Sequence, residues 1–381
     1  MKRFTSLVVI ALALVSMLSF TTLAAAQRED AYAILDAAPK IDTSVKGVHA
    51  FLAPPAGFNP LTASNRELLT YGLPQRPDPT ADARAYQNWE RGMLALKTHA
   101  VDVRTTPYYS TNAHFIGDPS QNADGTTLQN SPNWSGIANT NKLESWSNKT
   151  SFNQVVSFFP VPAANPAFGD PPCDDGPWFE VTWNGIDGFS DGDVVQGGSA
   201  SYWDGGGCKG QVQTYGWIEW YPSYSILPIY CTKTEICPVN PGDDFYVITY
   251  GAAGTVEQYV FVEDLTQQWS GTFGLTYVTG PGLVGSSAEY IVERPGCGSD
   301  CYYGLGNYVL EFFSESYAFD GVGTLFYPGS TAASTNILTM LADDGKTPIS
   351  YVWVYGTSGN AGKYSFTTAD ENCAYSGGCT K

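Results

Sequence analysis

The sequence predicts an all-β protein: an antiparallel β-sandwich preceded by a small, partly helical N-terminal region. From Trp134 onward, short runs of Val, Ile, Tyr, Phe and Trp alternate with a period of two and are bounded by Gly, Asp and Pro. No long helical pattern interrupts these runs. A region of about 250 residues of this kind lies within the size that one all-β domain reaches.

The first 26 residues predict a secretory signal peptide. Two basic residues near the start precede an apolar run, Leu7–Phe20, and three alanines stand before Gln27. The run is too short to span a bilayer, and no later segment is long enough to do so. We therefore expect a secreted protein that has no membrane association after export.

The part between residues 27 and 125 has a different pattern. Three helix-like segments are separated by Pro-rich breaks, and a polar linker rich in Asn, Gly, Thr and Ser follows them. The helix-like segments are residues 31–38, 64–72 and 81–100. We expect residues 27–125 to form a prosegment or accessory region with its linker, and residues 126–381 to form the β-domain.

Eight cysteines all lie from Cys173 onward. An even number of cysteines in an exported chain predicts disulfides. Close spacing favours three short loops, and this leaves one longer pair, although spacing alone does not fix the connectivity. The expected pairs are Cys231–Cys237, Cys297–Cys301, Cys373–Cys379 and Cys173–Cys208.

The β-domain has no histidine, because His49, His99 and His114 all lie in the first third of the chain. A Ser or Cys nucleophile normally takes its base from imidazole, and most zinc sites use it as well. Carboxylates, amides, hydroxyls and aromatic rings remain for any chemistry. We expect no metal and no cofactor.

Acidic residues are concentrated in the β-domain. Residues 27–125 carry nine Lys/Arg and eleven Asp/Glu, whereas residues 126–381 carry eight and twenty-six. This surface argues against nucleic acid and anionic membranes as partners, because phosphate binding needs clustered basic groups. It favours either simple solubility or a protein that works in acid, since the domain gains little positive charge when its carboxylates are protonated.

Alternation places several polar residues among aromatic ones. Trp217, Glu219 and Tyr221 share one face of a predicted strand, and Glu289 and Glu293 share one face of another. A carboxyl group on an apolar face often marks a site. Taken singly, however, each glutamate is better explained as an outward-facing polar residue.

A Gly-rich loop carries Asp187, Asp191 and Asp193. Aspartates at this spacing are able to hold calcium, but Asp-Gly loops are more often turns. The turn is the preferred interpretation.

Five segments in one order carry more information than composition does. They are NSPNWSG at 130–136, WNGIDG at 183–188, VVQGG at 194–198, WIEWYP at 217–222 and AEYIVERP at 288–295. This order resembles the glutamic peptidases, the eqolisin family of secreted, acid-acting endopeptidases. The resemblance extends from residue 130 to the last strands. It implies two curved antiparallel sheets in a concanavalin-like jelly roll, with the substrate cleft on the concave face.

The resemblance also implies the site. The catalytic pair of the family matches Gln196 and Glu289, with the glutamate activating water and the glutamine stabilising the tetrahedral intermediate. The implied partners are polypeptide substrates, and we expect a monomer. Ala200 departs from the family, which often has an aspartate there, and Tyr290 replaces a common tryptophan. The substrate-binding positions that match are Trp134, Trp183, Asp187, Trp217, Glu219 and Tyr221.

Three alternatives compete with this interpretation. A curved sandwich with many aromatic rings and two glutamates, Glu219 and Glu289, also suits a glycosidase or a carbohydrate-binding module. A non-catalytic secreted protein on the same scaffold is the second. The third is a serine-carboxyl peptidase, suggested by a Gly-Thr-Ser in residues 356–360, but the alternating helices and parallel strands of that fold are missing from the sequence pattern.

The N-terminal region suggests a hypothesis about regulation. Its basic residues stand beside a very acidic domain, so we expect it to block the cleft near neutral pH. Protonation of the domain's carboxylates would weaken the attraction and expose the linker to self-cleavage before about Thr126.

Overall fold

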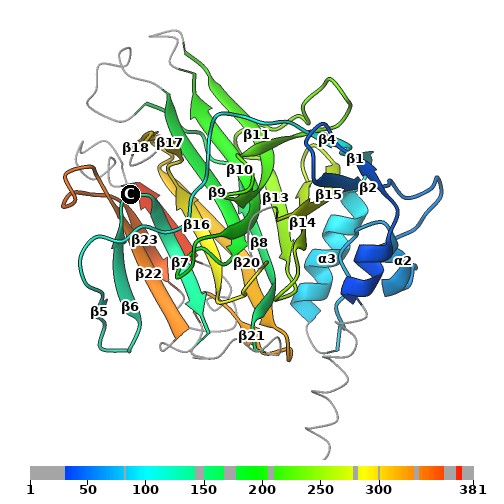
Figure 1. The fold of residues 1–381 in the computed structure, drawn as a ribbon, viewed down its shortest axis with the longest axis horizontal. Helices are drawn as coiled ribbons and strands as arrows, with labels where there is room; N and C mark the ends of the chain where they lie inside the picture. The colour runs from blue at the N-terminus through cyan, green and yellow to red at the C-terminus, as the bar shows by residue number, and fades with distance from the viewer. Residues whose placement is uncertain are drawn as a thin grey trace, which may run out of the picture.

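The computed structural model describes residues 31–80, 83–141, 150–166, 177–204, 210–277, 282–298, 301–329, 334–355 and 366–370. Over these residues the chain folds into two curved antiparallel sheets packed face to face, which confirms the predicted β-sandwich (Figure 1). The predicted signal peptide, residues 356–360 and four of the cysteines (173, 208, 373 and 379) lie outside the described residues.

Sheet I, as we name it, contains all the predicted site residues. Its neighbouring strands, in spatial order, are β12, β11, β10, β9, β16, β7, β22, β6 and β5. All of these pairs are antiparallel except β22 with β6. The bounds are β5 (Ser120–Gln121), β6 (Thr127–Ser131), β7 (Trp134–Thr140), β9 (Trp178–Ile186), β10 (Val194–Trp203), β11 (Val212–Tyr221), β12 (Leu227–Tyr230), β16 (Ser287–Glu293) and β22 (Thr335–Leu341).

Sheet II is the second layer, in the order β21, β20, β8, β13, β14, β15, β2 and β1. Strands β23 (Pro348–Tyr355) and β24 (Phe366–Asp370) connect β22 to β20, so the two sheets nearly close into a barrel. The bounds of sheet II are β1 (Lys40–Asp42), β2 (Val48–Phe51), β8 (Phe152–Pro160), β13 (Asp244–Tyr250), β14 (Glu257–Asp264), β15 (Trp269–Thr276), β20 (Leu310–Asp320) and β21 (Leu325–Phe326).

The main core lies between the two sheets. Alternate residues of sheet I, such as Val195, Ile218 and Tyr290, pack there against Val247 and Val260 of sheet II. The other alternate residues of sheet I therefore face away from the core. That outer face carries the site.

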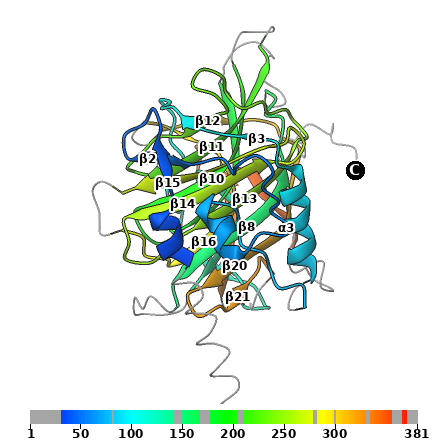
Figure 2. The same cartoon turned by 90° about the vertical axis from the view of Figure 1, so that its right-hand side faces the viewer.

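The N-terminal region is joined to the sandwich by strands and helices. A helical turn over residues 31–37, α2 (Asn65–Thr70) and α3 (Ala83–Ala95) cover the outer face of sheet II, where Trp89 is buried (Figure 2). These helices lie close to the predicted segments. Strand β2 extends sheet II by pairing with β15, and the short strands β3 (Thr98–His99) and β4 (Asp102–Val103) pair with β15 and β12.

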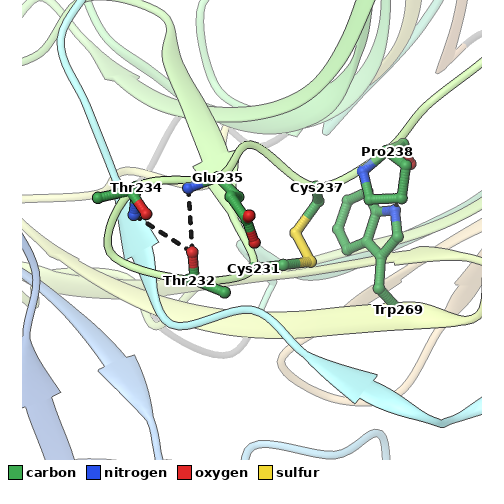
Figure 3. Close-up of a disulfide and its surroundings, with 7 residues drawn as sticks. All are labelled: Cys231, Thr232, Thr234, Glu235, Cys237, Pro238 and Trp269. Atoms are coloured by element: carbon green, nitrogen blue, oxygen red, sulfur yellow. Dashed lines mark hydrogen bonds between the residues drawn. A yellow bond between two sulfur atoms is a disulfide. The ribbon is translucent and has the colours of Figure 1, made fainter.

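Two of the expected disulfides are present. Cys231–Cys237 closes the turn after β12, where Thr232 accepts hydrogen bonds from two backbone N–H groups (Figure 3). Beside it the indole of Trp269 donates to the carbonyl of Pro238. Cys297–Cys301 joins β17 (Gly296–Gly298) to β18 (Cys301–Tyr302), and β19 (Gly304–Leu305) follows.

Among the described residues, no helix is long and apolar enough to cross a membrane.

Candidate active site

Four neighbouring strands place Gln196 and Glu289 in one row on the outer face of sheet I. Gln196 pairs with Glu219 on one side and with Gly185 on the other, and Gly185 also pairs with Glu289. Directly paired residues point to the same face of a sheet. Gln196 and Glu289 therefore flank the strand of Gly185, with backbones about 9.5 Å apart at ordinary strand spacing.

Gly185 leaves the space between the two side chains open. A Cβ atom at this position would lie 3.0 Å from the Trp183 ring and 3.1 Å from the Cβ of Gln196. Such contacts are tighter than normal carbon–carbon separations of about 3.5 Å. Glycine is therefore needed for the backbone to pass between the pair, because any side chain at this position would clash with its neighbours.

Aromatic rings surround this row. Trp183 and Trp217 lie one row further along the same face, and Trp134 lies two rows along. The rings of Trp134 and Trp183 meet edge to face with centroids 4.9 Å apart. Tyr221 is on this face as well and packs against the same cluster. Sequence alternation correctly predicted that Trp217 and Tyr221 share a face with Glu219, whereas Trp134 and Trp183 came from the resemblance.

A segment from the N-terminal region crosses this face. It comprises residues 106–114 and leads from β4 across sheet I toward β5; it is the cyan chain in Figure 1. The backbone N–H of Ser110 donates to Glu219 Oε2 (3.0 Å), and that of Thr111 donates to Glu293 Oε1 (2.9 Å). With the segment in place, the side chains of Glu219, Glu289 and Glu293 are fully buried.

Gln196 contacts the main chain of this segment. Its Nε2 lies 3.4 Å from the Ser110 carbonyl oxygen and 3.3 Å from Glu219 Oε2, and donates toward both. The Ser110 hydroxyl lies 3.3 Å from Gln196 Oε1 and also contacts Glu293 Oε2. The amide nitrogen of Gln196 thus already points at a peptide carbonyl.

The Ser110 hydroxyl lies between Glu293 and Gln196. A serine hydroxyl has one proton, so Ser110 cannot donate to both Gln196 and an ionised Glu293. Burial raises the pKa of Glu293 to about 8, against the lowering effect of hydrogen bonds from Ser110, Thr111 and Trp183. The Ser110 hydroxyl donates to Glu293 Oε2 in this structure, and burial favours the protonated form of Glu293 below about pH 8.

Burial acts in the same direction on the other two carboxyl groups. Burial raises the pKa of Glu219 well above its usual range, and the nearby Glu293 raises it further. Burial likewise raises the pKa of Glu289, with smaller contributions from Asp187 and Asp191 and an opposing one from the hydroxyl of Ser287. The closed cleft therefore places three carboxyl groups, whose protonated forms are favoured by burial, on the same face as one amide.

Asp187 holds the loop that precedes β16. It has a positive φ of 72°, and its carboxylate accepts hydrogen bonds from the backbone N–H groups of Val284, Gly285 and Ser286. In this arrangement its contacts are with the protein, and it fixes the strand that carries Glu289.

The aspartate loop is stabilised by protein donors. The carboxylates of Asp187, Asp191 and Asp193 lie within 4.8 Å of one another. Asp191 accepts from the Gly188 N–H and the Ser286 hydroxyl, and Asp193 accepts from the Trp220 indole. These donors occupy oxygens that a cation would need, which favours the turn interpretation.

Sequence reasoning did not assign Ser110, Asn133 or Glu293 to the site. Asn133 donates to the Asn112 carbonyl oxygen at 3.1 Å, and Glu293 receives the Trp183 indole N–H at 2.9 Å. The shared face of Glu289 and Glu293 was the available signal for Glu293. Nothing in the polar linker distinguishes Ser110 from its neighbours.

The architecture and the site together define a β-sandwich protein with an acid–amide centre on the outer face of one sheet. The model of the Peptidase A4 family matches residues 132–347, which is more than half of the chain. The chain belongs to this family and is a glutamic peptidase, a hydrolase that acts on polypeptides.

Similar solved structures include scytalido-glutamic peptidase with a transition state analogue inhibitor (17% identity, TM-score 0.46), covering 63% of this chain and 98% of that one. Aspergilloglutamic peptidase from Aspergillus niger has 21% identity and a TM-score of 0.40, covering 51% of this chain and 99% of that one. SCP-B, an eqolisin in complex with the tripeptide Ala-Ile-His, has 16% identity and a TM-score of 0.44, with 63% and 98% covered. No curated protein matches the chain.

Proposed function

We propose that the protein is a secreted, acid-acting endopeptidase in which Glu289 and Gln196 carry out the reaction. The observation that carries this proposal is the row in which Gln196 and Glu289 flank Gly185 on a face that also holds a peptide segment. Export is supported by the signal-peptide pattern that ends before Gln27.

Glu289 acts as the general base and then as the general acid. When ionised, it takes a proton from a water molecule as the water attacks the scissile carbonyl carbon. It returns that proton to the leaving amine, so the carboxylate is regenerated and no covalent intermediate forms. Because Glu289 and Gln196 lie on either side of Gly185 in one row, we propose that the water and the scissile carbonyl bind between the two groups.

Gln196 stabilises the negative charge that develops on the carbonyl oxygen. Its Nε2 is the donor that now points at the Ser110 carbonyl oxygen. A neutral amide keeps this donor at every pH at which the protein is folded. Removing one such donor lowers turnover by about 100- to 1,000-fold in other hydrolases.

Acid pH suits this centre. Burial raises the pKa of Glu289 in the folded chain, and exposure of the cleft to water would remove this effect and favour the ionised form. In the folded chain, burial raises the pKa values of Glu219 and Glu293, and when protonated these groups do not repel the developing oxyanion. We expect kcat/KM to rise as Glu289 ionises and to fall when these neighbours lose their protons.

The test is an assay of purified protein, preincubated in acid, for cleavage of denatured globin from about pH 2 to 7. Glu289→Gln and Gln196→Ala are assayed beside it, with circular dichroism to show that both are folded. Acid-confined, pepstatin-resistant cleavage that both variants lose supports the proposal. Undiminished cleavage by Glu289→Gln overturns the catalytic assignment, and cleavage or binding of polysaccharide in place of protein overturns the activity.

A further inference from the structure

The crossing segment is bound along its backbone by groups of the sandwich. Backbone N–H groups of Ile226 and Gly296 donate to the carbonyl oxygens of Tyr108 (2.9 Å) and Tyr109 (2.8 Å). The Trp134 indole donates to the Thr111 carbonyl oxygen (2.9 Å). The carbonyl groups before and after Ser110 are therefore bound by the sandwich, as is that of Ser110 itself by Gln196.

The segment's own N–H groups are bound as well. Those of Ser110 and Thr111 donate to Glu219 and Glu293, and that of Ala113 donates to the Gly188 carbonyl oxygen (2.8 Å). Main-chain hydrogen bonds of both kinds hold extended peptides in recognition grooves, while pockets for individual side chains supply specificity. The segment therefore has the contacts of a bound peptide.

One side chain of the segment enters a pocket of aromatic rings. The ring of Tyr108 lies 4.7 Å from that of Phe179, 5.6 Å from that of Tyr303 and 6.4 Å from that of Tyr202. All three separations lie in the range of favourable aromatic pairs, about 4.5–7 Å. Tyr109, the next residue, is 39% exposed and enters no such pocket.

The walls of this pocket are fixed by the sheet. Phe179 and Tyr202 are direct partners across β9 and β10, and their rings stack at 4.9 Å with an interplanar angle of 18°. Tyr303, between β18 and β19, lies 5.3 Å from Phe179. Because the walls contact one another, we expect the pocket to keep its shape when Tyr108 leaves.

The register of the segment relates this pocket to the reaction. If Gln196 is the oxyanion donor, the carbonyl of Ser110 stands where a scissile carbonyl would stand. Tyr108 is two residues before it in the chain. The ring of Tyr108 therefore marks a subsite at a defined distance from the cleaved bond.

We propose that Phe179, Tyr202 and Tyr303 form a substrate subsite for an aromatic side chain located two residues before the residue that supplies the scissile carbonyl, and that Tyr108 fills this subsite in the intact chain. The inference rests on the proposed function for its relation to the cleaved bond. The binding of an aromatic peptide to the pocket does not depend on catalysis.

Peptide binding tests the pocket without catalysis. The full chain with Tyr108→Ala and Glu289→Gln is titrated calorimetrically with the peptide Thr-Pro-Tyr-Tyr-Ser-Thr-Asn-Ala, the sequence of residues 106–113. Replacing the first tyrosine of the peptide by alanine should weaken binding at least about tenfold, because it removes the ring that contacts Phe179, Tyr202 and Tyr303. Replacing the second tyrosine is the matched control and should change affinity by less than about threefold. Equal affinities for the first two peptides, or no binding of either, overturn the proposal.

Cleavage-site profiling then tests the relation to the scissile bond in the otherwise unmodified chain. After acid incubation with a peptide library, mass spectrometry should show Tyr, Phe or Trp enriched two residues before the residue whose carbonyl is cleaved. Tyr202→Ala should reduce this enrichment, because it removes one of the three rings that contact Tyr108. Cleavage without the enrichment overturns the subsite while leaving the peptidase intact. Binding of the tyrosine peptide without any proteolysis supports the pocket and contradicts the proposed function.

Discussion

The N-terminal region contacts the sandwich at two surfaces of different chemistry. On sheet II, α3 buries apolar side chains such as Trp89 and Met93 against Tyr246 and Phe261. On sheet I, residues 106–114 are bound mainly through hydrogen bonds to carboxyl, amide and indole groups. The first surface is a piece of hydrophobic core, whereas the second resembles a peptide in a groove. One region of the chain is therefore attached to one sheet by apolar packing and to the other mainly by hydrogen bonds.

The two surfaces share one electrostatic property. Glu263 lies under α3, where burial raises its pKa well above the usual range, with Asp264 raising it further and Arg91 lowering it. Glu219 and Glu293 lie under the crossing segment with raised pKa values. Docking at both surfaces therefore favours protonated carboxyl groups. The raised pKa values therefore favour tighter docking of the N-terminal region in acid. Net charge alone leads to the opposite expectation, release of this region in acid, and that expectation stays a prediction.

The largest expected effect is on the apolar surface. Trp89→Ala removes a fully buried indole that also donates to the Pro74 carbonyl oxygen at 2.8 Å. It should lower the free energy of unfolding by about 3–5 kcal/mol, as other truncations of buried aromatics do. Denaturant unfolding followed by fluorescence measures this. A loss below about 1 kcal/mol would contradict the assignment of this surface as core.

The second effect is a dependence of stability on pH. The pKa values of Glu180 and Glu293 are raised by burial to about 8 from the usual 4.5. A carboxyl group with a raised pKa in the folded state contributes stability that is fully present below about pH 4.5 and is lost as pH rises toward 8. The melting temperature should therefore be at least about 5 °C higher at pH 4 than at pH 8. Calorimetry at the two pH values, with ionic strength held constant, tests the sign.

The third effect concerns the hydrogen bonds that hold the crossing segment in the cleft. Ser110→Ala removes the hydroxyl that links Gln196 and Glu293 but keeps the segment's backbone bonds. We expect a loss in unfolding free energy of about 1 kcal/mol, near the value of one hydrogen bond. Amide exchange of residues 106–114 should become several-fold faster, while exchange in α3 stays unchanged. Equal acceleration at both surfaces would show that they open together.

The smallest effect is expected from the ion pairs around the helices. Arg91 contacts Asp244, and both side chains are about half exposed. Arg91→Ala should change the free energy of unfolding by less than about 1 kcal/mol, because solvent screens such pairs. In about 0.5 M salt, the difference in free energy of unfolding between the two proteins should be smaller still, because salt screens the ion pair. A larger loss would mean that charge attraction, and not burial, holds the helices.

The sandwich and much of the site were predictable because they follow local rules. Period-two alternation identified the long strands and the shared faces of Glu219 with Trp217 and of Glu289 with Glu293. The pairing of Gln196 with Glu289 around Gly185 was not predictable from alternation, since strand order is a long-range property. It came from the motif resemblance alone.

The missed parts have physical reasons. Strands β1 to β4 contain two to four residues each, too few to show a period, and β2 forms only because β15 offers an open edge. The crossing segment is polar and irregular, so its sequence resembles a linker. Its course is set by the groups that bind it, Glu219, Glu293 and Trp134. Glu219 and Glu293 lie more than a hundred residues away along the chain, and Trp134 lies about twenty away, so local sequence patterns do not reveal these contacts.

Strand β2 has a consequence for the chain after any cut in the crossing segment. Residues 48–51 would still pair with β15, and residues 102–103 would still pair with β12. Trp89 would also remain buried against sheet II. These contacts would hold the N-terminal piece to the sandwich after the peptide bond between them is cut. A nicked molecule would then migrate as two polypeptides on a denaturing gel and as one particle in gel filtration, so the mature protein would be a two-chain enzyme.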